Sequence, residues 1–207
     1  MTRLDEVRQG ILEMLKEVPT TQSLLVGISG IDASGKGYVS AKLANALATD
    51  LQVAVINGDG WLNLRHIRFD NTEPGQHFYD NALRLDQMFE RLVLPLKLNR
   101  GIKTTLDVVD ETAVEVCPHE CVYENIDVIL LEGIFLFKQA FVEHFDMRIW
   151  IDCSLETALN RAIVRSQEGL SPGETIKAYE TIYFPAQHLH LGIDHPKASA
   201  DLVIDNN

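Results

Sequence analysis

The sequence contains little cysteine, no long hydrophobic run and few basic side chains. Its three cysteines are an odd number, which does not suit a disulfide framework. No apolar stretch reaches the roughly 18 residues that cross a bilayer, and the opening residues MTRLDEVRQG have no signal-peptide core. These absences exclude a disulfide-stapled scaffold and a membrane-spanning protein, and they predict a reduced, cytoplasmic protein with no membrane partner.

Basic residues are outnumbered, with 18 Lys and Arg against 30 Asp and Glu and a formal net charge of -12. Residues 1–100 carry 11 basic and 12 acidic side chains, whereas residues 101–207 carry 7 and 18. Such a chain attracts nucleic acid poorly over long range, so we expect no nucleic-acid partner. Any phosphate must be bound by a few local groups. The sequence leaves a homo-oligomer open.

Short apolar segments alternate with amphipathic ones along the chain, a pattern typical of a parallel sheet covered by helices on both faces. The length of 207 residues suits one α/β domain. We predict strands at 23–29, 52–56, 127–131, 147–151 and 201–204, helices at 4–18, 38–48, 83–98, 136–144, 155–167 and 174–188, and a hairpin with strands at 103–109 and 112–116.

A glycine-rich segment lies between the first predicted strand and the helix that follows it. It reads Gly30-Ile31-Asp32-Ala33-Ser34-Gly35-Lys36-Gly37. The pattern Gly-x4-Gly-Lys lets backbone N–H groups surround a phosphate at a helix N-terminus, while the lysine reaches the outer phosphates. It therefore predicts a P-loop that binds a nucleotide. A plain strand-to-helix turn is the alternative.

The residue after Lys36 is Gly37, where a P-loop normally has the Ser or Thr that ligates Mg²⁺. A bound metal must then rely on carboxylates and water, with Ser34 or Ser40 as candidate substitutes.

Two acidic residues follow predicted buried strands. Asp59 comes just after residues 52–56, and Glu132 ends the apolar run Val128–Leu131. Ligands of open α/β sheets bind at the carboxyl ends of strands. Asp59 is thus a candidate base for an acceptor hydroxyl, and Glu132 a candidate Mg²⁺ ligand. A turn aspartate and a salt-bridged glutamate are the alternatives.

Arg161 and Arg165 lie four residues apart on one predicted helix face, before a segment that contains Gly169, Pro172 and Gly173. Such a pair can bind polyphosphate oxygens from a mobile lid, which we place at about residues 161–175. A solvated surface pair is the alternative.

The ordered blocks GIDASGKG, INGDGW, FDNTEPGQHFYDNALRLDQM, VILLEGIFLF, RAIVR and ADLVIDN resemble the uridine kinase and phosphoribulokinase family over residues 24–206. The resemblance implies a P-loop NTPase fold, ATP and Mg²⁺ as cofactors, Asp59 as catalytic base and Glu132 as metal ligand. It also implies that residues 30–37, Arg161 and Arg165 bind ATP, with Tyr79 and Asp80 at the acceptor.

The resemblance is weakest in the hairpin. Uridine kinases carry Tyr-Asp followed by Thr-His-x-Arg there, whereas this chain has residues 104–111 without histidine or arginine. Residues 107–124 hold six acidic side chains and no Lys or Arg, which disfavours a phosphorylated acceptor.

The sequence thus predicts one kinase domain over residues 1–207, with an N-terminal helix within 1–20, a hairpin insertion at 102–117 and a lid. It would phosphorylate a hydroxyl of a small neutral acceptor, a nucleoside or sugar-like alcohol, with Asp59 and Lys36 as catalytic residues and Asp59 and Glu132 at the metal. A nucleotide-binding regulatory or degenerate kinase is the alternative. A GTPase is disfavoured because the chain has no Asn-Lys pair.

Overall fold

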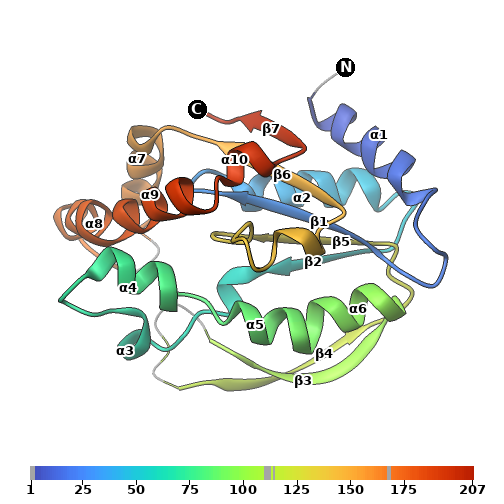
Figure 1. Cartoon of the computed structure of the whole chain (residues 1–207), viewed down its shortest axis with the longest axis horizontal. Helices are drawn as coiled ribbons and strands as arrows, with labels where there is room; N and C mark the ends of the chain where they lie inside the picture. Colours follow the sequence, from blue (N-terminus) through green and yellow to red (C-terminus); the bar gives the residue numbers. More distant parts are fainter. Residues whose placement is uncertain (1–2, 110–112, 114, 167–168) are drawn as a thin grey trace.

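The computed structural model describes residues 3–109, 113, 115–166 and 169–207. A five-stranded sheet lies at its centre, in the order β2-β5-β1-β6-β7, and every neighbouring pair is parallel (Figure 1). The strands are β1 (Leu24–Gly30), β2 (Val53–Asn57), β5 (Val128–Gly133), β6 (Met147–Asp152) and β7 (Leu202–Asp205). β1 and β5 are buried along their whole length, as their apolar composition predicts. The predicted α/β fold class is confirmed.

Two hydrophobic cores lie on opposite faces of this sheet. One holds α1 (Arg3–Leu15) and α2 (Lys36–Leu47) against alternate β1 residues such as Leu24 and Val26. The other packs Leu25 of β1 with the continuous helical stretch formed by α5 (Leu85–Met88), η2 (Phe89–Val93) and α6 (Leu94–Asn99). The strand alternates between the two cores because successive side chains point to opposite faces.

Further helices gather on the left side of the molecule in Figure 1. A single bent stretch comprises α8 (Pro172–Ala178), the π-helical turn η4 (Tyr179–Tyr183) and α9 (Phe184–Ile193). The remaining helices and short helical turns are α3 (Arg65–Arg68), α4 (Pro74–Asn81), α7 (Leu155–Arg165), α10 (Pro196–Ser199), η1 (Gly58–Gly60) and η3 (Val142–His144). α9 packs along α4. Arg165 ends α7, and residues 167 and 168 of the predicted lid lie outside the described residues.

The hairpin lies below the helical stretch α5–α6 in Figure 1 and pairs β3 (Ile102–Val108) with β4 (Cys117–Tyr123). The second strand therefore follows the stretch predicted for it, residues 112–116, and the insertion extends past residue 117. Cys121 and Tyr123 of β4 pack against the core beside the helical stretch. That burial outweighs the β-propensity of the Thr112–Val116 segment, part of which lies outside the described residues.

The helix predicted at 136–144 is also wrong, because the structure has only the turn Val142–His144 there. Leu136 and Phe137 are both fully buried, so consecutive side chains enter the core. They continue a run of buried side chains over residues 134–137, which is longer than one helical turn, whereas an amphipathic helix buries only one face of each turn. The preceding Phe135 adopts a φ of 59°, and the backbone N–H of Gln139 donates to Asp194, 3.0 Å away. Tertiary contacts thus replace helical hydrogen bonds in this segment.

Candidate active site

The segment Gly30–Gly37 turns tightly between β1 and α2. A Cβ on Gly30 would lie 2.6 Å from the carbonyl oxygen of Ile151, so only glycine fits beside β6. Gly35 has a φ of 93°, and a Cβ there would meet the side-chain nitrogen of Asn206 at 2.4 Å. The glycine pattern therefore serves a strand-to-helix turn that closely contacts its neighbours and ends at a helix N-terminus. Such a terminus offers free backbone N–H groups to an anion.

Groups far away in the sequence hold this turn in place. Asn206, next to the C-terminal residue, donates its side-chain N–H to the carbonyl of Ser34 over 2.7 Å. Arg161 also reaches that carbonyl, at 3.4 Å. The Tyr179 hydroxyl donates to the Asp32 carboxylate. The turn is thereby tied to α7, to the π-helical turn η4 and to the segment after β7.

Asp59 and Glu132 come together because β2 and β5 are adjacent parallel strands. Asn57, the last residue of β2, pairs with Glu132, and its side chain accepts a 2.7 Å hydrogen bond from the Asp59 backbone N–H. A Cβ on Gly58 would stand 3.1 Å from the carbonyl oxygen of Glu132, so the glycine permits the close approach. The two predicted acids thus lie at one edge of the sheet, as expected.

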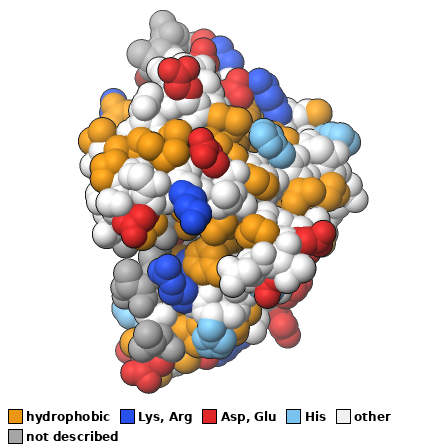
Figure 2. Space-filling view, turned by 90° about the vertical axis from the view of Figure 1, so that its left-hand side faces the viewer, with side chains coloured by type: hydrophobic (Ala, Val, Ile, Leu, Met, Phe, Trp, Pro, Cys, Tyr) orange, Lys and Arg blue, Asp and Glu red, His pale blue; other side chains and the backbone are white. Residues whose placement is uncertain are grey.

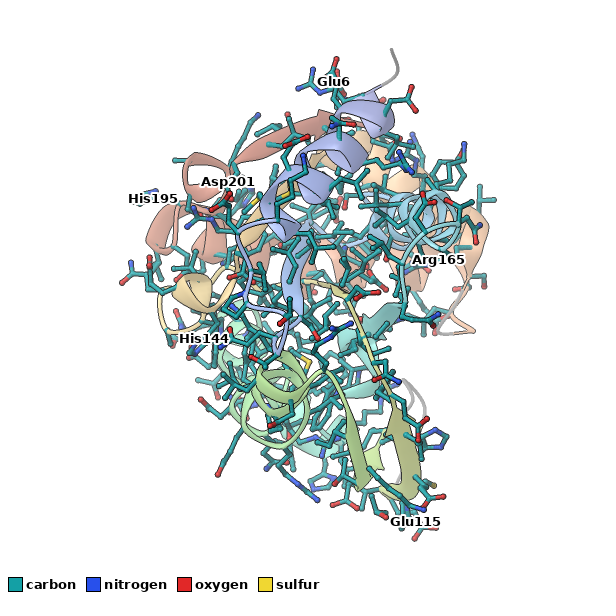
Figure 3. The ribbon with its side chains drawn as sticks, turned by 90° about the vertical axis from the view of Figure 1, so that its right-hand side faces the viewer. Glu6, Glu115, His144, Arg165, His195 and Asp201 are labelled. Atoms are coloured by element: carbon teal, nitrogen blue, oxygen red, sulfur yellow. The ribbon has the colours of Figure 1, made fainter. Side chains whose placement is uncertain are left out.

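A cavity of about 280 Å³, here named the donor cavity, lies over the glycine-rich turn. Arg165, which Figure 3 shows beside α2, also lines it. Its walls are formed by Asp32, Ala33, Gly35, Lys36, Gly37, Tyr38, Asn57, Asp59, Glu132, Ile134 and Arg165. The structure therefore brings together most of the predicted nucleotide-binding residues and both predicted metal ligands. Gly30, Ser34 and Arg161 do not line this cavity, and Arg161 contacts the turn through the carbonyl of Ser34.

Burial raises the pKa of both carboxyl groups in this cavity above the ordinary value. For Asp59 and for Glu132, desolvation is the main cause, and the positive charge of Lys36 partly offsets it. Each acid also disfavours a charge on a neighbouring acid, Asp32 for Asp59 and Asp59 for Glu132. A buried and a half-buried carboxylate, both with raised pKa values, are favourable ligands for a divalent cation, which would remove that penalty.

The donor set fits Mg²⁺, which prefers oxygen ligands. Glu132 and Asp59 supply carboxylate oxygens in the donor cavity, whereas Gly37 supplies no hydroxyl. Ser34 and Ser40 are buried and do not line that cavity, so neither replaces the missing hydroxyl there. Within the described parts of the chain, no cluster of three or more His, Cys, Asp or Glu residues forms a separate metal site.

A second cavity, here named the acceptor cavity, adjoins the donor cavity. Asp32, Asp59, Ile134 and Arg165 line both. The remaining walls come from four separate segments and comprise Leu62, Arg68, Phe78, Tyr183 and Gln187. Asp59 thus faces a compartment on each side. This arrangement suits a base that lies between a phosphoryl donor and an acceptor hydroxyl.

Tyr79 and Asp80, the predicted acceptor contacts, line neither cavity. Tyr79 is buried, and its hydroxyl donates a 2.6 Å hydrogen bond to Asp194. Burial and this bond raise the pKa of Tyr79 well above its ordinary value. Asp80 is exposed and accepts a hydrogen bond from Gln76 at 2.8 Å. The packing gives Tyr79 an evident role in joining α4 to the end of α9, while the acceptor role of both residues stays a prediction without support from this geometry.

Sequence patterns did not single out Arg68, Tyr183 or Gln187. Arg68 stands in a four-residue helix that periodicity cannot reveal. The spacing of Gln187 could have indicated it. It is a polar residue four positions after Tyr183, on the same face of the helix, and both residues are buried. The described acids of residues 107–124 line neither cavity, and Glu115 lies at the far end of the hairpin (Figure 3).

A further cavity, about 700 Å³, opens beside α3, α8 and η4, on the side of the molecule that Figure 2 faces. Basic, acidic and hydrophobic side chains are interspersed across that face. Among the described residues, none of the helices combines the length and the apolar character that a bilayer crossing requires.

The chain is similar in sequence to known kinases. The model of the Phosphoribulokinase / Uridine kinase family matches residues 25–206. The chain is 30% identical over 192 residues to a uridine kinase from Macrococcus caseolyticus, covering 89% of this chain and 88% of that protein. It is 27% identical over 191 residues to a uridine kinase from Cronobacter sakazakii, covering 88% and 87%.

A solved structure described as a possible uridine kinase from Bacillus stearothermophilus shares the fold, with a TM-score of 0.73 and 23% identity. The alignment covers 97% of this chain and all of that one. The sequence resemblance is therefore confirmed: the chain belongs to the phosphoribulokinase and uridine kinase family and is a phosphotransferase that acts on a hydroxyl group.

Proposed function

We propose that this protein is an ATP-dependent kinase that phosphorylates a hydroxyl of a small neutral acceptor, a nucleoside or sugar-like alcohol. The observation that carries the proposal is the position of Asp59, which lines the donor cavity and the acceptor cavity at once. A hydroxyl bound in the acceptor cavity would meet a carboxylate able to take its proton, beside the place where phosphates bind.

In this proposal the donor cavity positions the triphosphate. Backbone N–H groups of residues 30–37 and the ammonium of Lys36 bind phosphate oxygens, and Arg161 and Arg165 supply further positive charge. Lys36 is nearly buried and donates to the carbonyl of Ile31 over 2.8 Å, which holds it over the turn. Glu132 and Asp59 would hold Mg²⁺, which neutralises charge on the phosphates when bound.

The charge around the acceptor cavity supports a neutral acceptor. Two acids, Asp32 and Asp59, face two guanidinium groups, Arg68 and Arg165, so the walls carry no net charge. Neither a phosphate nor a cation on the acceptor would gain a large electrostatic advantage there. The equal numbers of acidic and basic side chains in this cavity, and not the acidic hairpin segment, therefore favour a neutral acceptor.

The test is a turnover assay with the purified full chain, ATP and Mg²⁺ against a panel of nucleosides, vitamins and sugars. We expect ADP to form only with an acceptor, together with the acceptor monophosphate identified by mass spectrometry. ATP binding without phosphorylation of any compound in the panel would refute the kinase and favour the regulatory nucleotide-binding alternative, to which the missing hydroxyl at Gly37 also points.

A further inference from the structure

Gln187 contributes a buried side-chain amide to α9. Its side chain is 1% exposed, yet it lines the acceptor cavity. In the described part of the chain, neither its amide nitrogen nor its amide oxygen has a hydrogen-bond partner. Buried polar side chains in folded proteins are nearly always hydrogen-bonded, so an amide with both ends open needs an explanation.

The helix around Gln187 holds the side chain in place. α9 packs along α4, and Gly75 permits the contact, since a Cβ there would lie 2.5 Å from Cβ of Pro185. Ala186, the next residue, is fully buried. At the end of the helix, the Asp194 carboxylate accepts hydrogen bonds from Tyr79 and His190. Because contacts fix α9 at both ends, the Gln187 side chain cannot turn toward solvent without disturbing the packing of the helix.

A buried amide whose N–H₂ and C=O groups lack hydrogen-bond partners suits a ligand group that both donates and accepts hydrogen bonds. Leaving a buried amide unpaired is unfavourable, and a ligand that completes its hydrogen bonds removes that cost. A hydroxyl group donates and accepts at once, as the N–H₂ and C=O of glutamine require. Asp59 lines the same cavity, so a hydroxyl bonded to the amide would lie in the compartment where the reacting hydroxyl is bound.

We propose that Gln187 is a specificity-determining residue of the acceptor cavity: its amide binds a second hydroxyl of a polyhydroxy acceptor, next to the hydroxyl that Asp59 deprotonates. The inference rests on the proposed kinase function. It narrows the acceptor class to neutral compounds with neighbouring hydroxyl groups, such as the ribose of a nucleoside, and it disfavours simple monohydroxy alcohols.

The first test observes the amide directly, with uridine as the probe. In protein labelled with ¹⁵N-glutamine, the side-chain signal of Gln187 is identified by its absence from Gln187→Leu. Uridine should shift that signal, and uridine analogues that lack the 2′- or the 3′-hydroxyl should identify the group it contacts. A signal that uridine leaves unmoved overturns the assignment.

The second test measures discrimination. Gln187→Leu keeps the side-chain volume and removes both polar ends. For the preferred acceptor we expect kcat/KM to fall about 30-fold, the size of one lost buried hydrogen-bond partner, with the KM for ATP within about twofold. The variant should also lose the preference for the hydroxylated acceptor over its deoxy analogue. Its melting temperature should stay unchanged or rise, whereas a structural role would lower it.

His188→Leu is the matched control, because His188 is the exposed neighbour on the same helix; it should leave kinetics and the Gln187 signal unchanged. The two proposals can fail separately. Turnover of a panel compound with an unmoved signal and unaltered discrimination would refute the role of Gln187 and leave the kinase standing. A signal that moves without any turnover would refute the kinase and retain the binding role.

Discussion

The donor and acceptor cavities share Asp59 and Arg165 but are built in different ways. The donor cavity rests on one continuous segment, residues 30–37, together with the ends of two strands. The acceptor cavity takes Leu62, Arg68, Phe78, Tyr183 and Gln187 from separate helices and connections. Phosphate binding by backbone groups depends on local turn geometry, which a short motif specifies. Recognition of an acceptor depends on side chains that only the packing of distant helices brings together.

The largest effect is expected where the two cavities meet. Asp59→Asn keeps the size of the side chain and removes its ability to accept a proton, so kcat should fall about 10³-fold. ATP binding, measured by calorimetry without acceptor, should stay within severalfold of the original. A variant that keeps more than a tenth of the turnover would remove Asp59 from the role of base.

Substitution of Arg165 and of Arg161 should distinguish a residue that lines the cavities from a residue that holds the turn in place. Arg165 lines both cavities and lies 3.6 Å from Asp32, whereas Arg161 lines neither cavity and contacts the turn through the carbonyl of Ser34. Arg165→Ala should lower kcat about 10²-fold, as loss of a charge-stabilising donor does, and Arg161→Ala about 5-fold. Equal losses in a steady-state assay would contradict this division.

The stability of the helices beside the acceptor cavity should depend on Asp194, which does not line that cavity. Asp194 accepts hydrogen bonds from Tyr79, His190 and the Gln139 backbone, at 2.6, 2.7 and 3.0 Å. Asp194→Ala should lower the free energy of unfolding by about 2–3 kcal/mol, because buried donors lose a charged partner. Urea denaturation measures this loss. Unchanged stability would show that the three contacts do not hold α4 and α9 together.

As the pH is lowered, activity should begin to fall at a higher pH than it would if the base were an aspartate with an ordinary pKa. Burial raises the pKa of Asp59, and only the deprotonated carboxylate accepts a proton. The value of kcat/KM should therefore fall tenfold per pH unit below this raised pKa. The sign for stability is the opposite: the stabilising contribution of a carboxyl with a raised folded-state pKa is full below its unfolded pKa and is lost as pH rises through the raised value. A pH–rate profile with an acid limb at the ordinary aspartate pKa would contradict the prediction.

The smallest effect concerns the metal. A Cβ on Gly37 would lie 3.8 Å from the Glu132 carboxylate, an ordinary contact, so serine fits. Gly37→Ser should supply the missing hydroxyl and lower the Mg²⁺ concentration for half-maximal activity about threefold, on the order of one weak ligand exchanged for water. Gly37→Ala is the matched control. An unchanged Mg²⁺ dependence in the serine variant would count against the missing ligand.

The sequence predicted the parts of the site that lie at strand ends or within one turn. The glycine-rich turn begins at the last residue of β1, Asp59 follows the half-exposed strand β2, and Glu132 is the next-to-last residue of β5. Parallel pairing of β2, β5 and β1 places their carboxyl ends at one edge. Predictions were less accurate where the hydrophobic pattern of a segment and its tertiary packing favour different local structures. The second hairpin strand begins at Cys117, and Leu136 and Phe137 enter the core without forming a helix.

By itself, then, the sequence determined the family, the parallel sheet and the phosphate-binding turn, because these depend on local conformation and on the hydrophobic pattern of each segment. Only the tertiary structure decided that Tyr79 is buried and bonded to Asp194 and that Gln187 and Asp59 line the same cavity. Which face of a helix borders a cavity depends on how that helix packs against the others. For α9, the close contact with Gly75 of α4 is part of that packing.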